Sequence, residues 1–151
     1  MLTKRCEICG NSFSCYSDEK TCWCKEVSID AEKSNIISNF GIDCFCENCI
    51  TELKDSKLTN SNQEIKINTV HGIMQLVIKK KKTGFLIEIH DKKYRYPLLS
   101  ENVSGENNAI MKFTQYNIKL KNNQFKIIRN IEALDENYRR VFSRVRYGIL
   151  F

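Results

Sequence analysis

The chain has 151 residues, of which 42% are hydrophobic and 28% charged, and its formal net charge is +6. This length suits one ordinary domain, or a small stabilised module followed by a modest domain. The sequence shows neither a signal peptide nor the ~20 consecutive apolar residues that span a bilayer, so we expect a cytoplasmic protein without a membrane anchor.

All eight cysteines lie between Cys6 and Cys49, and the 102 residues that follow contain none. In a reducing cytosol thiols stay free to ligate metal, whereas an oxidising compartment would convert an even number of cysteines into disulfides. Because no secretion signal is visible, we prefer metal binding over a disulfide framework.

The charge divides at the same place as the cysteines. Residues 1–54 hold six Lys/Arg against nine Asp/Glu, a net of −3, and residues 55–151 hold eighteen against nine, a net of +9. Residues 54–63 are polar and rich in turn formers. We therefore predict a cysteine-rich module over residues 1–54, a linker over 55–63 and a basic domain over 64–151, whose charge favours a polyanionic partner.

The module is predicted to contain little regular structure. Ser28 is a candidate cap for a helix over about 29–40 that ends at Gly41. Ile50 and Leu53 suggest a short turn of helix after the last cysteine. So small a module can hardly bury enough apolar surface to fold alone, so its folding and metal binding should be one event.

The basic domain is predicted to consist mainly of antiparallel strands. Three strands are expected over 64–70, 73–79 and 84–90, with a lysine-rich turn between the last two. Tyr94 and Tyr96 suggest another strand that ends at Pro97. A loop is then expected over 100–108, followed by a long strand over 109–120 with a bulge near Thr114. The predicted pattern ends with a turn at Asn122–Asn123 and a short strand over 125–128.

The C-terminal part changes its apolar period. Asn130 is a candidate helix N-cap, and six apolar residues recur at helical spacing: Ile131, Leu134, Tyr138, Val141, Phe142 and Val145. The predicted fold class is α+β, a small two-site metal-stapled cysteine-rich module followed by a mainly antiparallel β domain with a C-terminal helix.

Four cysteines form the first predicted metal site. Cys6 and Cys9 are spaced to reach one ion, and Gly10 permits the tight turn of a knuckle. Cys46 and Cys49 repeat the spacing, which is the arrangement of a zinc ribbon. The first site is therefore Cys6, Cys9, Cys46 and Cys49.

The remaining cysteines, Cys15, Cys22, Cys24 and Cys44, suffice for a second site. Cys22-Trp23-Cys24 and Cys44-Phe45-Cys46 are C-x-C pairs, whose side chains point to one face of an extended segment. Spacing alone does not decide which member of each pair serves which site. Trp23 and Phe45 are expected to cover the metals.

The whole cysteine pattern reads Cys6-x2-Cys9-Gly10, Cys15, Cys22-Trp23-Cys24 and Cys44-Phe45-Cys46-x2-Cys49-Ile50. This pattern resembles that of the bacterial cysteine-rich CWC family. The resemblance covers about residues 4–54, and Glu7 stands where the family usually has proline. It implies a small zinc-binding module and implies no reaction.

All-thiolate sites suit Zn²⁺, iron or Cu(I). Zinc is the expected metal of a closed structural site, with two ions per chain. Iron–sulfur is the alternative, although the spacings match neither ferredoxin pattern.

No catalytic constellation is found, and His71 and His90, the only histidines, are not needed as ligands. The candidate nucleic-acid contacts are the arginines near the C-terminus, which alternate with aromatic residues, and two lysines of the run 79–82. These residues are Arg139, Arg140, Arg144, Arg146, Lys80 and Lys81.

We therefore expect a non-enzymatic zinc-binding adaptor that contacts RNA, DNA or a protein through its basic domain. The alternative is a redox or metal-handling protein that uses the cysteines themselves, as an iron–sulfur cluster, a transferable metal or a reactive thiol. The sequence identifies no small-molecule substrate.

Overall fold

The computed structural model describes residues 2–15, 29–39, 45–57, 62–133 and 143–151, with the main chain alone for 38, 130–133 and 143–146. The cysteine-rich part contains β1 (Leu2–Arg5), β2 (Ser12–Cys15), α1 (Ala31–Ser38) and α2 (Glu47–Asp55). The rest contains β3 (Asn62–Thr69), β4 (Gly72–Lys81), β5 (Gly84–Asp91), β6 (Leu99–Val103), α3 (Glu106–Lys121), β7 (Lys126–Ala133) and β8 (Ser143–Leu150).

Strands β3 to β6 form an antiparallel sheet in the order of the chain. Ile65, Leu76 and Ile89 are direct cross-strand neighbours on the face that is turned to the core. Successive residues of a strand point to opposite faces, so the alternation of apolar and polar residues sets this register. The three strands predicted over 64–70, 73–79 and 84–90 are confirmed.

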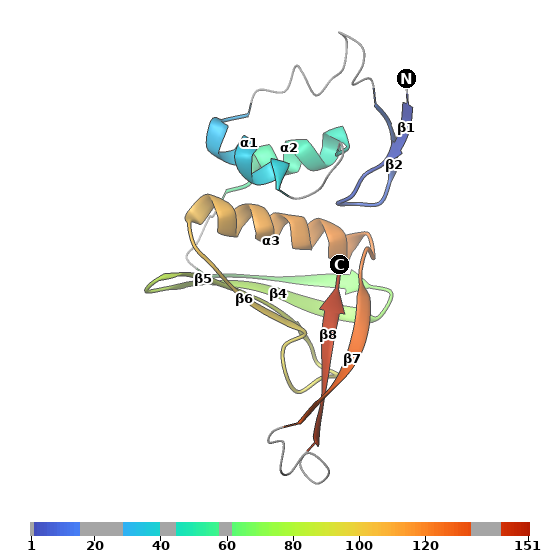
Figure 1. The fold of residues 1–151 in the computed structure, drawn as a ribbon, viewed down its shortest axis with the longest axis vertical. Coiled ribbons are helices and arrows are strands. Elements are labelled where there is room, and N and C mark those ends of the chain that lie inside the picture. Colours follow the sequence, from blue (N-terminus) through green and yellow to red (C-terminus); the bar gives the residue numbers. More distant parts are fainter. Residues whose placement is uncertain (1, 16–28, 40–44, 58–61, 134–142) are drawn as a thin grey trace.

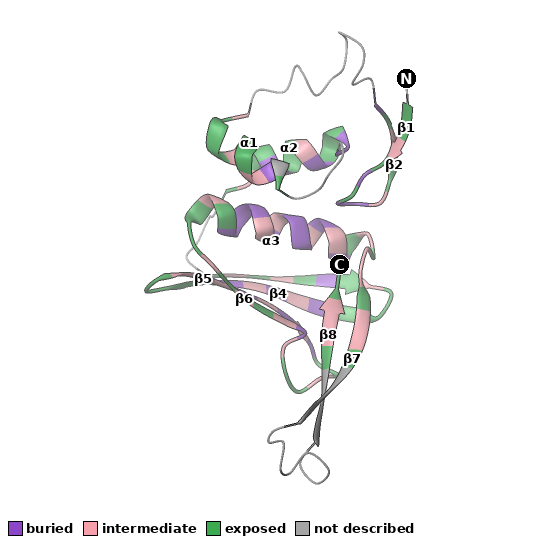
Figure 2. Ribbon diagram, viewed as in Figure 1, coloured by how far each residue is buried: buried purple, intermediate pink, exposed green. Residues whose placement is uncertain are grey.

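Helix α3 lies between the sheet and the pair α1 and α2 (Figure 1). Buried residues are found around α3, not along a single stripe (Figure 2). One continuous cluster of buried side chains includes Cys6, Leu53, Met111 and Leu76, so the thiols and the sheet share a core. The division into a module, a linker and a domain stays a prediction.

The strand predicted over 109–120 is wrong, because these residues belong to α3. At 100° per residue, Ala109, Phe113 and Leu120 lie on one side of the helix, and Met111 and Ile118 lie on the opposite side. With both sides buried, the sequence resembles a continuous apolar strand. The change of parity near Thr114 reflects helical geometry and not a bulge.

The helix predicted over 131–145 is wrong where the chain is described. β7 and β8 are antiparallel strands, with Ile131 opposite Val145. The apolar residues of the expected helix that lie between these strands, from Leu134 to Phe142, fall outside the described residues. The α+β class holds, because a helix does lie in the C-terminal half, at α3.

Two smaller predictions also differ from the structure. Residues 92–97 form turns and not a strand, while β6 occupies part of the predicted loop over 100–108. Helix α1 is capped by Asp30, whose carboxylate accepts a hydrogen bond from the main-chain N–H of Lys33 at 2.9 Å. The predicted cap Ser28 and stop Gly41 lie outside the described residues. The turn of helix after the last cysteine is confirmed as part of α2.

No helix in the described part of the chain has the length and apolar character needed to cross a membrane.

The carboxylate of Glu101 ties β6 to α3. It accepts hydrogen bonds of 2.6 Å from Lys112 Nζ and from the Tyr116 hydroxyl. Burial, together with this carboxylate, raises the pKa of Tyr116 well above its ordinary value. The hydroxyl therefore stays a hydrogen-bond donor throughout the neutral range.

We expect Tyr116→Phe to lower the free energy of unfolding by about 1.5–3 kcal/mol, because one oxygen of a charged carboxylate loses its donor. Urea denaturation measures this loss. Tyr147→Phe is the control, since its ring is 38% exposed and meets the ring of Tyr94 in a tilted contact that the substitution keeps. An equal loss in both variants would contradict a specific role of the Glu101 contact.

Candidate metal centre

Four buried thiols meet where the hairpin of β1 and β2 approaches the start of α2. Cys6 and Cys9 come from the hairpin turn, Cys46 immediately precedes α2, and Cys49 lies in the first turn of α2. Each residue is at most 8% exposed. All four sulfur atoms lie within 4.8 Å of one another, so this set has the ligand number and chemistry of a single metal site.

The hairpin turn has the shape of a knuckle. The N–H of Gly10 donates to the carbonyl of Cys6 at 2.9 Å, and Gly10 has a φ of +77°, a conformation that favours glycine. Arg5 Nε donates to the Gly10 carbonyl at 2.9 Å. A Cβ on Gly10 would lie 2.4 Å from the side chain of Gln124, so the connection between α3 and β7 packs directly on the knuckle.

The second pair of cysteines lies at the beginning of a helix. Cys46 is the N-cap residue of α2, and Cys49 lies in its first turn. The free N–H groups at a helix N-terminus favour negative charge, which suits thiolate ligands. The comparison with a zinc ribbon therefore fits the first pair, whereas the second pair is presented by a helix and not by another knuckle.

The distances suit a metal site better than a disulfide. The sulfurs of Cys9 and Cys46 are 3.7 Å apart. A tetrahedral zinc ion with Zn–S bonds of about 2.3 Å holds its sulfurs about 3.8 Å apart, whereas a disulfide requires about 2.05 Å. In addition, the N–H of Cys46 points at the sulfur of Cys6, at 3.4 Å.

Three of the thiols have shifted pKa values, and the shifts differ in direction. A hydrogen bond from Cys49 and main-chain N–H groups lower the pKa of Cys6 to about 4, against the effect of burial. Burial raises the pKa of Cys46 to about 11. The pKa of Cys49 is also raised, because its thiol donates to Cys6 and is itself buried. Without a cation the cluster therefore readily holds only one deprotonated thiol. A divalent ion would offset the repulsion between thiolates and so allow more of them to be deprotonated.

A cation of the chain also lies near the thiols. Burial lowers the pKa of Lys119, and the negative charges of Glu7 and Cys6 oppose this shift. Lys119 Nζ lies 5.7 Å from the ring centre of Phe151. Sequence analysis did not find Lys119 or Gln124, because their role depends on the position of α3 against the knuckle.

The second predicted metal site is only partly visible. Cys15 is buried at the end of β2, whereas Cys22, Cys24 and Cys44 lie outside the described residues. The second site therefore stays a prediction. Phe45 is 5% exposed and packs in the same core as the thiols, and Trp23 lies outside the described residues.

The predicted nucleic-acid contacts stay a prediction, and those that the structure describes lie at two separate places in the fold. Lys80 and Lys81 lie at the end of β4, whereas the main chain of Arg144 and Arg146 lies in β8. β8 packs near the far end of β5, because Tyr147 stacks on Tyr94 at 4.5 Å. The eight residues of β5 separate these places by about 25 Å. Arg139 and Arg140 lie outside the described residues, and the main chain of residues 143–146 belongs to β8 and not to a helix.

Residues 6–51 match the family model described as cysteine-rich CWC. No curated protein and no solved structure matches the chain.

Leu53, one helical turn after Cys49, is fully buried. We expect Leu53→Ala to lower the free energy of unfolding by about 2–5 kcal/mol, because it opens a cavity in the shared core. Leu150→Ala is the matched control: this leucine is 55% exposed, so its truncation should cost about 0.5 kcal/mol or less. Equal effects in urea denaturation would show that α2 contributes little to the common core.

Proposed function

We propose that residues 6–51, as a cysteine-rich CWC segment, form a structural metal centre on which a non-enzymatic adaptor is built. The observation that carries this proposal is the gathering of four buried thiols within 4.8 Å, in the core that α3 shares with the sheet. Such a centre contributes the folding energy that a segment this small cannot supply from apolar burial.

Zinc is the metal that this donor set favours. Four thiolates complete a tetrahedron and leave no open position for a substrate, as in structural zinc sites. Cys6, Cys9, Cys46 and Cys49 would hold the first ion. Cys15, Cys22, Cys24 and Cys44 would hold a second ion, so that each chain carries two.

Native mass spectrometry of protein purified without air tests this proposal. We expect two zinc ions per chain and no visible absorbance. Cys49→Ser should remove one ion and lower the melting temperature of the whole chain, because the first site belongs to the common core. Cys22→Ser should remove the other ion.

Two results would contradict the zinc centre. The first is unchanged metal content in Cys49→Ser. The second is iron with visible absorbance, which would favour a redox role of the cysteines.

A polyanion is the proposed partner, with RNA or DNA ahead of a protein. The support is electrostatic: residues 55–151 carry eighteen Lys/Arg against nine Asp/Glu. Neutralised phosphates release counterions, so binding of this kind weakens steeply with salt.

We expect the metal-loaded chain to bind a fluorescent 20-nucleotide single strand at 50 mM salt, and to lose affinity about tenfold or more by 200 mM. Fluorescence anisotropy measures both values. Affinity that is independent of salt would contradict phosphate contacts.

A further inference from the structure

Two cavities lie on either side of the turn between β3 and β4. The first has a volume of about 340 Å³ and lies at the end of the sheet. It contains both histidines of the chain, with Lys66, Lys92 and Lys93 around them. Gln75 lies between Lys66 and His90 in the register of the sheet, so this row of side chains forms part of the wall.

The second cavity has a volume of about 480 Å³ and lies beside the metal centre. Arg5 enters it from the knuckle hairpin, and Phe125 and Lys126 enter it from the start of β7. Leu150 and Phe151 form its apolar part.

Two contacts join the walls of these cavities. The rings of His71, from the first cavity, and Phe125, from the second, are 5.6 Å apart. Next to them, the N–H of Val70 donates to Asn123 Oδ1 at 2.8 Å. Figure 1 shows the β3–β4 turn beside the beginning of β7. The two cavities therefore lie next to each other around this turn, and we refer to them together as the groove.

The groove carries unbalanced positive charge. Arg5, Lys66, Lys92 and Lys126 make no ion pair with any described residue. The only acidic side chain in the described lining is Asp91, which is 5% exposed.

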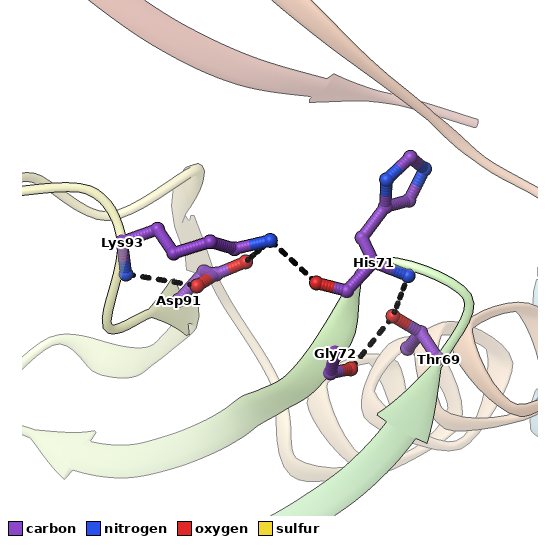
Figure 3. A network of polar contacts seen from close by, with 5 residues as sticks. All are labelled: Thr69, His71, Gly72, Asp91 and Lys93. Carbon is purple, nitrogen blue, oxygen red and sulfur yellow. Dashed lines mark hydrogen bonds and ion pairs between the residues drawn. The ribbon is translucent and has the colours of Figure 1, made fainter.

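The negative charge of Asp91 is already compensated by contacts to Lys93. Its carboxylate accepts the main-chain N–H of Lys93 at 2.9 Å and pairs with Lys93 Nζ at 3.5 Å. Figure 3 shows Lys93 reaching across to the carbonyl of His71, while the imidazole of His71 points away from this network. Glu88, the next acidic residue along β5, forms an ion pair with Lys79 at 3.6 Å.

The groove also exposes apolar surface between its cations. Val70 is 74% exposed, Ile73 58%, Leu150 55% and Phe151 36%. Large apolar side chains in such exposed positions, next to aromatic rings and to cations that form no ion pair within the described part of the chain, indicate a binding surface.

We propose that this groove binds single-stranded nucleic acid. The inference rests on the proposed polyanionic partner and locates its contact. Lys and Arg side chains neutralise phosphates, while His71, Phe125 and Phe151 offer rings to bases that are not paired. A duplex keeps its bases stacked inside and uses only the cations. The groove differs from the sites predicted at the arginine cluster and at Lys80 and Lys81.

Anisotropy titrations with a 20-nucleotide single strand, its duplex and a polyglutamate of similar charge test the groove. The first variant combines Lys66→Ala, Lys92→Ala and Lys126→Ala. The matched control combines Lys80→Ala, Lys81→Ala and Lys82→Ala, which removes the same charge from exposed positions at the opposite end of the sheet. Metal content and melting temperature check that each variant folds as the parent does.

We expect the groove variant to lose single-strand affinity at least tenfold at 50 mM salt, and the control less than threefold. His71→Ala should weaken single-strand binding about fivefold and leave duplex binding unchanged, because only an unpaired base stacks on its ring.

Three results would overturn the proposal in distinguishable ways. Metal-loaded wild-type protein that binds no oligonucleotide would reject the polyanionic partner and leave the metal centre standing. Equal losses in the groove variant and in the control would reject this location and keep the partner class. Duplex or polyglutamate bound as tightly as the single strand would reject stacking of unpaired bases.

Discussion

The burial of α3 on two opposite sides is the constraint on which the described structure depends. A helix with apolar residues on both sides is stable only between two layers. The sheet of β3 to β6 supplies one layer, and α1 and α2 supply the other. Neither layer covers α3 alone. Folding of the cysteine-rich segment and folding of the sheet are therefore coupled through this helix.

The thiol cluster adds a chemical condition to this packing. Four buried sulfurs lie close together; hydrogen bonds, the largest from Cys49, lower the pKa of Cys6, while burial raises the pKa of Cys46, and the hydrogen bond to Cys6 together with burial raises that of Cys49. A bound cation would offset the negative charge of the thiolates and link α2 to the knuckle. Since Leu53 of α2 belongs to the same core as Met111 of α3, metal binding would also stabilise the rest of the chain.

The metal centre and the groove are neighbours for the same reason. The connection after α3 packs against the knuckle through Gln124, and the next residue, Phe125, contacts His71 of the β3–β4 turn. An acidic cysteine-rich segment thus contributes one cation, Arg5, to a surface made mostly by the basic part. A metal ion held by the four thiols would therefore support one wall of the groove.

The sequence by itself determined the features that depend on residues close together along the chain. The spacing of Cys6, Cys9 and Gly10 predicts the knuckle, and the alternation along β3, β4 and β5 predicts those strands, because both follow from local backbone geometry. Only the tertiary structure decided that residues 109–120 form a helix, since apolar residues on both sides of it imitate a strand. Tertiary structure likewise decided that Ile131 and Val145 pair across β7 and β8. The pairing of these two strands outweighs the helical spacing of their apolar residues. The groove is likewise a product of tertiary structure, since Arg5 and Lys126, which are far apart in the sequence, line one cavity only when the knuckle and β7 come together at the end of α3.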